Sequence, residues 1–172
     1  AQIAESAFGE LTGAEQTYFE QQAAWLIKKE RAKKWRKSLA GYSDFAKISV
    51  WPDTRRELTL EQLFARFRTP LPAALTQYAS QSTYRWHYVN AHYHLQTGAS
   101  RCRLPATGEL IAVWPKLIEA YRQGTEMQRA IVLAFIVHLL ADANQPLHTM
   151  AALDKACESD AGGNGFCLQQ KG

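Results

Sequence analysis

The sequence has few cysteines, no long apolar run and no strong strand pattern, and each shortage narrows the possible fold. The longest apolar run lies within residues 130–141, which is too short to span a bilayer. No internal repeat or low-complexity tract is present, and 172 residues can bury a full core without help from disulfides. We therefore expect a single all-α domain over residues 1–172, built from several helices.

Three cysteines are compatible with an oxidising compartment. Cys157 and Cys167 would close a short loop around the sequence GGN, which leaves Cys102 to find a partner elsewhere. Buried or free thiols are the alternative, because cysteine connectivity cannot be read from a sequence.

Several segments carry helical signals. Thr12 and Glu15 have the spacing of a capping box and predict a long helix that ends at about Trp35. The segments LTLEQLFARF and ELIAVWPKLIEAYRQ predict two more helices, and the residues near Tyr84 are also helix-like. A further apolar helix should begin at Thr125 and end before Pro146, with residues 149–172 as a loop.

The net charge of +4 mildly favours polyanionic partners but identifies none. The basic run of residues 28–37 is interpreted as the solvated end of the first long helix, and a nucleic-acid tract is the alternative. The aromatic residues at positions 84, 86, 88 and 93 are expected in the core, and base stacking is the alternative.

The apolar helix LAFIVHLLADA is interrupted by His138 and Asp142 on one face, because a step of four residues is close to one helical turn. His148 follows just past Pro146. An imidazole and a carboxylate among apolar side chains need partners, and a divalent cation would satisfy both. A buried His–Asp hydrogen bond that only ties the core together is the alternative.

Two other residues of the same chemical kind favour the cation. Asp53 follows Pro52, and His87 lies in an aromatic segment. With His138 and Asp142 they offer two nitrogens and two oxygens, a plausible ligand set for zinc.

At this point the chain resembles a known family. Four motifs occur in the order found in the secreted zinc-dependent single-strand nucleases, which are related to the bacterial zinc phospholipases C. These motifs are WPD, WHYVN, HLLADANQPLH and GGN, and Arg56 follows the aspartate of WPD by three residues. The resemblance covers essentially the whole chain and implies a mostly helical fold that holds three zinc ions at the bottom of a cleft. It implies hydrolysis of phosphoester bonds in single-stranded DNA and RNA by a zinc-bridged hydroxide, in a secreted or periplasmic protein.

The resemblance also implies roles for individual residues. Asp53, His87, His138 and Asp142 would bind the first zinc, Asp142 would bridge to a second ion, and His148 would belong to the third.

Residues near these ligands would act on the substrate. Asp53 and Arg56 are the candidate catalytic residues, and Arg56 would also contact the phosphate, with an ordinary exposed arginine as the alternative. Asn164 of GGN would help to hold the scissile phosphate, although this sequence is also a common turn. Asn90 stands where the family has an acid that contacts the base, so the base preference is not carried over.

The chain departs from the family pattern at both ends. The expected amino-terminal Trp and nearby His are absent, and no His lies beyond His148. We expect the chain to be an interior portion of a longer domain that can complete one zinc site, so this segment should bind metal weakly, singly or not at all. The full-length protein is then the enzyme.

Two other functions compete with the nuclease. A zinc phospholipase C would share the metal site and act on a lipid headgroup, whereas a metal-free helical interaction module would have kept the fold and lost the chemistry. The preference for DNA or RNA, 3′-nucleotidase activity and oligomeric state are left open.

Overall fold

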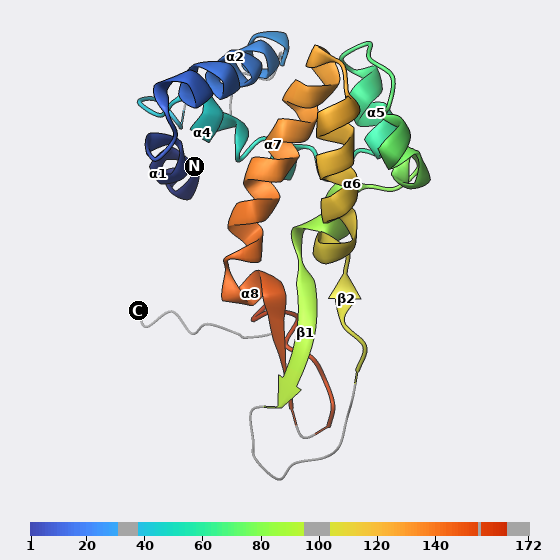
Figure 1. The fold of residues 1–172 in the computed structure, drawn as a ribbon. Helices are drawn as coiled ribbons and strands as arrows, with labels where there is room; N and C mark the ends of the chain where they lie inside the picture. The colour runs from blue at the N-terminus through green and yellow to red at the C-terminus, as the bar shows by residue number, and fades with distance from the viewer. Residues whose placement is uncertain (31–37, 95–103, 155, 165–172) are drawn as a thin grey trace.

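The fold is described from a computed structural model, which defines residues 1–30, 38–94, 104–154 and 156–164. Most of the chain in these ranges is helical, and a small sheet extends from one end of the helices (Figure 1). In chain order the elements are α1 (Gln2–Gly9), α2 (Gly13–Lys29), α4 (Asp44–Ile48), η1 (Pro52–Thr54), α5 (Leu60–Ala65), η2 (Ala73–Tyr78), η3 (Thr83–His87), β1 (Val89–His94), β2 (Thr107–Gly108), α6 (Leu110–Gln123), α7 (Glu126–Ala143), α8 (Pro146–Thr149) and β3 (Met150–Leu153). None of the described helices is long and apolar enough to cross a membrane.

Helix α7 forms the centre of the fold. Five consecutive residues, Ile131 to Phe135, are buried, because the helix is apolar on almost every side. It lies beside α6, while α2 crosses near one end of both helices (Figure 1). Trp51 and Trp86 pack edge-on against Phe135. These contacts hold two segments against α7: the segment of Trp51, which leads to Asp53, and the segment of Trp86, which leads to His87.

Capping side chains define where three helices begin. Complete capping boxes join Thr12 to Glu15, Thr59 to Gln62 and Thr125 to Gln128. The predicted starts at Thr12 and Thr125 are therefore confirmed.

The predicted end of the first long helix at Trp35 is wrong. Helix α2 ends at Lys29, and Glu30 adopts an extended conformation with φ −73° and ψ 118°. The carboxylate of Glu30 is buried against Trp51 and Arg55, which a straight continuation of the helix would not favour. Residues 31–37, including the rest of the basic run, lie outside the described residues.

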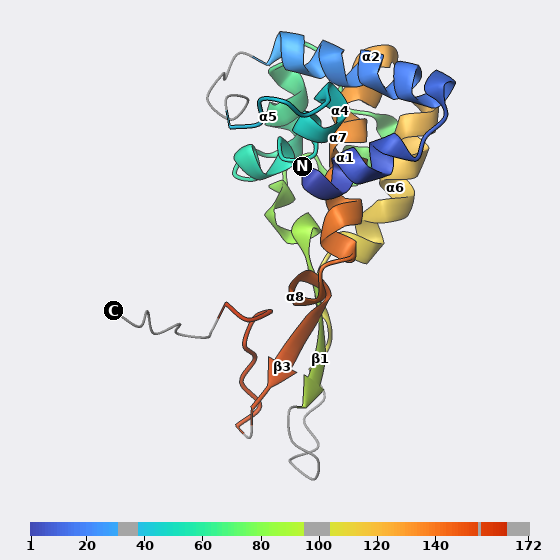
Figure 2. The ribbon, with the colours of Figure 1, turned by 90° about the vertical axis from the view of Figure 1, so that its left-hand side faces the viewer.

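A three-stranded sheet corrects the all-α prediction, although the fold is mostly helical as expected. β1 is the central strand and pairs with β2 antiparallel and with β3 parallel, placing Ala91 opposite Met150 and His94 opposite Leu153. β1 and β3 project together from the helical part (Figure 2).

The sheet replaces a predicted helix-like segment and part of a predicted loop. The helical signal near Tyr84 is only the short 3-10 helix η3, and the chain then becomes strand because VNAHYH alternates between half-buried and exposed positions. The loop predicted from residue 149 contains β3, whose Ala151, Ala152 and Leu153 are buried by the non-local pairing.

Candidate metal centre

The last turns of α7 present the two residues that the sequence placed on one helical face. His138 and Asp142 are both buried, and His138 Nε2 lies 3.0 Å from Asp142 Oδ2. The other ring nitrogen, Nδ1, donates to the carbonyl of Ser49 at 2.6 Å. Because a carbonyl oxygen only accepts, Nδ1 carries a proton, and Nε2 is the ring nitrogen that faces the centre.

Two 3-10 helices complete the group. His87, the last residue of η3, places Nδ1 2.8 Å from Nε2 of His138 and 3.3 Å from Oδ2 of Asp142. Asp53 in η1 places Oδ1 3.5 Å from His87 Nδ1 and 3.7 Å from His138 Nε2. Asp53, His87 and His138 have ligand atoms within 4.8 Å of one another and form a group that can hold a metal ion.

His148 meets Asp142 from the other side. Its Nδ1 atom lies 3.1 Å from Oδ1 of Asp142, whereas Oδ2 of the same carboxylate faces His87 and His138. The Oδ2 atom of Asp142 and Nδ1 of His148 are buried and receive no directed hydrogen bond from the described residues. Buried acceptors that converge in this way fit a cation, which needs lone pairs and no proton between them.

The ionisation of the two α7 residues is linked. Burial raises the pKa of Asp142, but the His138 and His87 imidazoles beside its carboxylate and the nearby positive charge outweigh burial and hold the pKa well below its ordinary range. Burial lowers the pKa of His138, but the adjacent negative carboxylate of Asp142, with that of Asp53, outweighs burial and raises the pKa above its ordinary value. Asp142 is therefore an anion, and a metal at Nε2 of His138 would compete with the proton that the Asp142 carboxylate favours there.

A cavity of about 470 Å³ opens beside this group, and we call it the metal-centre cleft. It gathers residues from η1, η3, β1, α8 and the GGN turn. Its lining consists of Asp53, Arg56, Tyr84, His87, Tyr88, Asn90, Leu147, His148, Ala161 and Asn164. All three residues that the resemblance assigned to the substrate, at positions 56, 90 and 164, thus lie in the same cleft.

The side chains on the cleft wall are held by few contacts. Arg56 is half exposed, with Cζ 5.6 Å from the centroid of the Tyr84 ring. Asn164 donates from Nδ2 to the carbonyl of Ala161 at 2.8 Å, which fits the turn alternative. Gly162 has φ +69°, and a Cβ there would collide with the carbonyl oxygen of Leu147, so glycine brings this turn against α8.

The aromatic residues near the cleft correct another expectation. Trp86 is in the core as predicted, but Tyr84 and Tyr93 are 51% and 42% exposed. The short η3 helix turns Trp86 inward and leaves Tyr84 on the cleft wall, whereas Tyr93 occupies an exposed position of β1.

The buried carboxylate of Glu30 binds the residues on either side of Asp53. This role of Glu30 was not identified from the sequence. It accepts from Trp51 Nε1 at 3.0 Å and from Arg55 Nε at 3.2 Å, and Arg55 Nη2 lies 3.1 Å from its second oxygen. Trp51 and Arg55 stand two residues before and two residues after Asp53. One signal was available: Glu30 is the single acid within the basic run of residues 28–37.

Cys157 is disulfide-bonded, but its pairing with Cys167 stays a prediction, because Cys102 and Cys167 lie outside the described residues.

Comparison with known families gives an independent result. A family model described as S1/P1 Nuclease matches residues 14–172. Searches of curated proteins and of solved structures found no match.

Proposed function

Because the chain belongs to the S1/P1 nuclease family, we propose that it acts as a zinc-dependent endonuclease that hydrolyses single-stranded DNA and RNA in its metal-centre cleft. Membership of this family implies hydrolysis of single-stranded nucleic acid, and the family is zinc-dependent and generally secreted. Residues 1–172 form part of one nuclease domain in this proposal, and the protein is exported.

The observation that supports the proposal best is the convergence of imidazole nitrogens and carboxylate oxygens at one side of a cleft. Asp53, His87, His138 and Asp142 come from three separated segments, yet their facing atoms lie within 3.7 Å of at least one partner. A helical module without metal has no evident need for two imidazoles and two carboxylates to meet in this way.

These four residues would hold one zinc ion. Asp142 would also contribute to a second site, because its Oδ1 atom already faces His148. Zinc at such sites supplies Lewis acidity, which lowers the pKa of a bound water and stabilises the departing oxygen.

The chain's own side chains would then orient the substrate. Arg56 presents a planar guanidinium at the cleft wall, suited to two oxygens of one phosphate. Asn164 would donate to the same phosphate after releasing the carbonyl of Ala161, and Asn90 would meet the base. Tyr84 and Tyr88 provide aromatic surface beside these groups, and unpaired bases stack on such surfaces.

The test combines elemental analysis with hydrolysis by the protein carrying its native termini. We expect bound zinc and cleavage of single-stranded DNA that a chelator abolishes and added zinc restores. No zinc and no cleavage would refute the proposal and favour the helical interaction module. Release of a phosphorylated headgroup from phosphatidylcholine, without cleavage of nucleic acid, would instead assign the protein to the phospholipase C reaction.

A further inference from the structure

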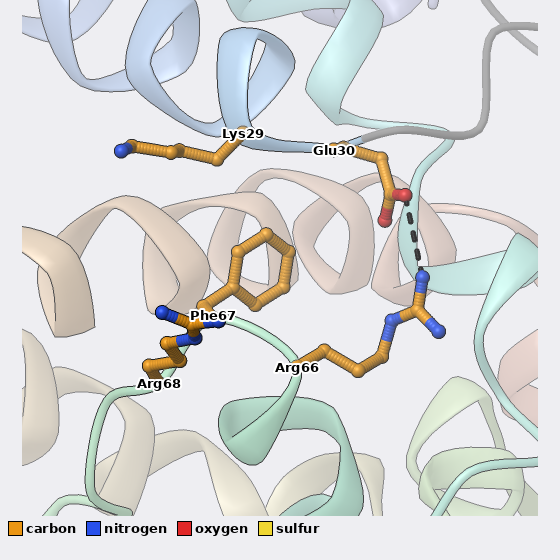
Figure 3. A pocket seen from close by; sticks show the side chains of 5 residues that line it. All are labelled: Lys29, Glu30, Arg66, Phe67 and Arg68. Atoms are coloured by element: carbon orange, nitrogen blue, oxygen red, sulfur yellow. Dashed lines mark hydrogen bonds and ion pairs between the residues drawn. The ribbon is translucent and has the colours of Figure 1, made fainter.

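A second cavity lies between the end of α2 and the end of α5 (Figure 3). Its volume is about 570 Å³, within the range of sites for small ligands. The described residues that line it are Lys29, Glu30, Arg66, Phe67 and Arg68, and none of these lines the metal-centre cleft. We call this cavity the Arg68 pocket.

The Arg68 pocket carries an excess of positive charge. Among the described lining residues the one carboxylate is that of Glu30, which is buried and paired with Arg55 and with Arg66, the latter 3.5 Å away (Figure 3). Lys29 and Arg68 make no ion pair or side-chain hydrogen bond within the described part of the chain. Two cations without partners in a concave site attract anions more strongly than cations on a convex surface do.

The backbone of Arg68 gives a second indication. Its N–H donates to the carbonyl of Ala65, the N–H of Thr69 donates to the carbonyl of Phe64, and its φ is +52°. This is the Schellman ending of a helix, in which the left-handed position is normally glycine. An arginine there is strained, so local folding does not account for it, and strain of this kind is often found at binding sites.

Phe67 supplies an apolar part of the wall. Its ring is half-buried and packs against Trp25 and Trp51 with centroid distances of 6.2 and 5.9 Å. Cationic side chains beside an aromatic ring are the usual components of a site that holds a phosphate and its base in a single strand.

We propose that the Arg68 pocket binds a nucleotide unit of single-stranded nucleic acid, with Lys29 and Arg68 on its phosphate, at a place separate from the metal-centre cleft. The choice of ligand rests on the proposed nuclease function. Strands long enough to reach both places are held at two points and bind more tightly than short ones, because the second contact is intramolecular.

The experiment measures binding of a labelled oligothymidylate by fluorescence anisotropy in a chelator, so that no cleavage occurs. Arg68→Gly and Lys29→Gln are compared with Arg122→Gln, an exposed cation on α6 outside both cavities. We expect Kd to rise at least five-fold in the first two variants only, with the slope of log Kd against log salt reduced by about 0.7 per lost phosphate contact.

Arg68→Gly separates binding from folding. Its Tm should stay the same or rise, since glycine suits the left-handed backbone. Unchanged Kd and salt slope in both pocket variants would overturn the proposal. Loss of binding to phosphatidylserine vesicles, with oligothymidylate binding intact, would also overturn it by assigning the pocket to lipid headgroups.

Hydrolysis of a short substrate keeps this proposal distinct from the nuclease function. Cleavage of a dinucleotide should be unaffected by Arg68→Gly. If the protein cleaves strands and both pocket variants bind them normally, the nuclease function stands. The proposal of a second binding site is then refuted. A protein that never cleaves but whose pocket variants bind strands weakly retains the second site alone.

Discussion

Replacing Glu30 should weaken both the fold and the metal centre, because one buried carboxylate supports the segment on either side of Asp53. In Glu30→Ala the buried Nε1 of Trp51 loses its acceptor, which costs about 1–3 kcal/mol. The Arg55 side chain, 15% exposed, loses its buried ion pair, and breaking such pairs costs about 3–5 kcal/mol. These two terms overlap, and the exposed pair with Arg66 adds little, so we expect the free energy of unfolding to fall by roughly 3–5 kcal/mol.

Glu30→Gln is the milder variant, because an amide oxygen still accepts from Trp51. We expect it to lose about 2 kcal/mol, chiefly through the charge of Arg55. Zinc affinity should also fall by about ten-fold or more, since groups that orient metal ligands typically contribute that much. Urea unfolding measures the first effect, and zinc titration against a competing chelator measures the second.

Glu20→Gln is the matched control. Glu20 lies on the same helix and accepts from the backbone N–H groups of Asp44 and Phe45 at 2.8 and 2.9 Å, which ties α2 to α4 rather than to Asp53. It should lower stability and leave zinc affinity unchanged. Equal zinc affinities in the Glu30 and Glu20 variants, or a loss of less than 1 kcal/mol in Glu30→Ala, would refute the reasoning.

Three further predictions concern the metal centre. In a chelator, the raised pKa of His138 adds stability below about pH 6.5, and this stability is lost as the pH rises through the pKa of the folded protein. The lowered pKa of Asp142 adds stability above about pH 3.8, which is lost as the pH falls. Tm should therefore be highest between these two pH values, and a flat profile would contradict the assignment. His87→Ala removes one member of the group and should lower zinc content after dialysis to near zero, whereas retention of the wild-type content would exclude His87 as a ligand. Arg56→Met should reduce kcat/KM on single-stranded DNA by about 10–100-fold through loss of a charge-assisted phosphate contact, and the exposed Arg122→Met should not; equal rates would remove Arg56 from the site.

The sequence predicted the parts of the site that depend on local periodicity. A four-residue step placed His138 and Asp142 together, and Pro146 ended the helix before His148, as the structure has it. These inferences succeed because the helical repeat and the missing proline N–H act within a few residues.

The parts that failed depend on contacts between distant segments. Short apolar sequences such as that of β3 have no periodicity that distinguishes strand from loop, and only the parallel pairing with β1 determines their state. The burial of Glu30 likewise depends on Trp51 and Arg55, and nothing in its own neighbourhood marks it except its sign of charge.

The parallel pairing of β1 with β3 has a consequence for the order of folding. The partners His92 and Ala151 are far apart in the chain, and closing so long a loop is slow because its entropic cost precedes any gain from contacts. His87 and His138 are likewise 51 residues apart, so the metal cluster is complete only after a contact of similar range has formed. A metal that binds the finished cluster should then slow unfolding far more than it speeds folding, so its protection would be kinetic as much as thermodynamic.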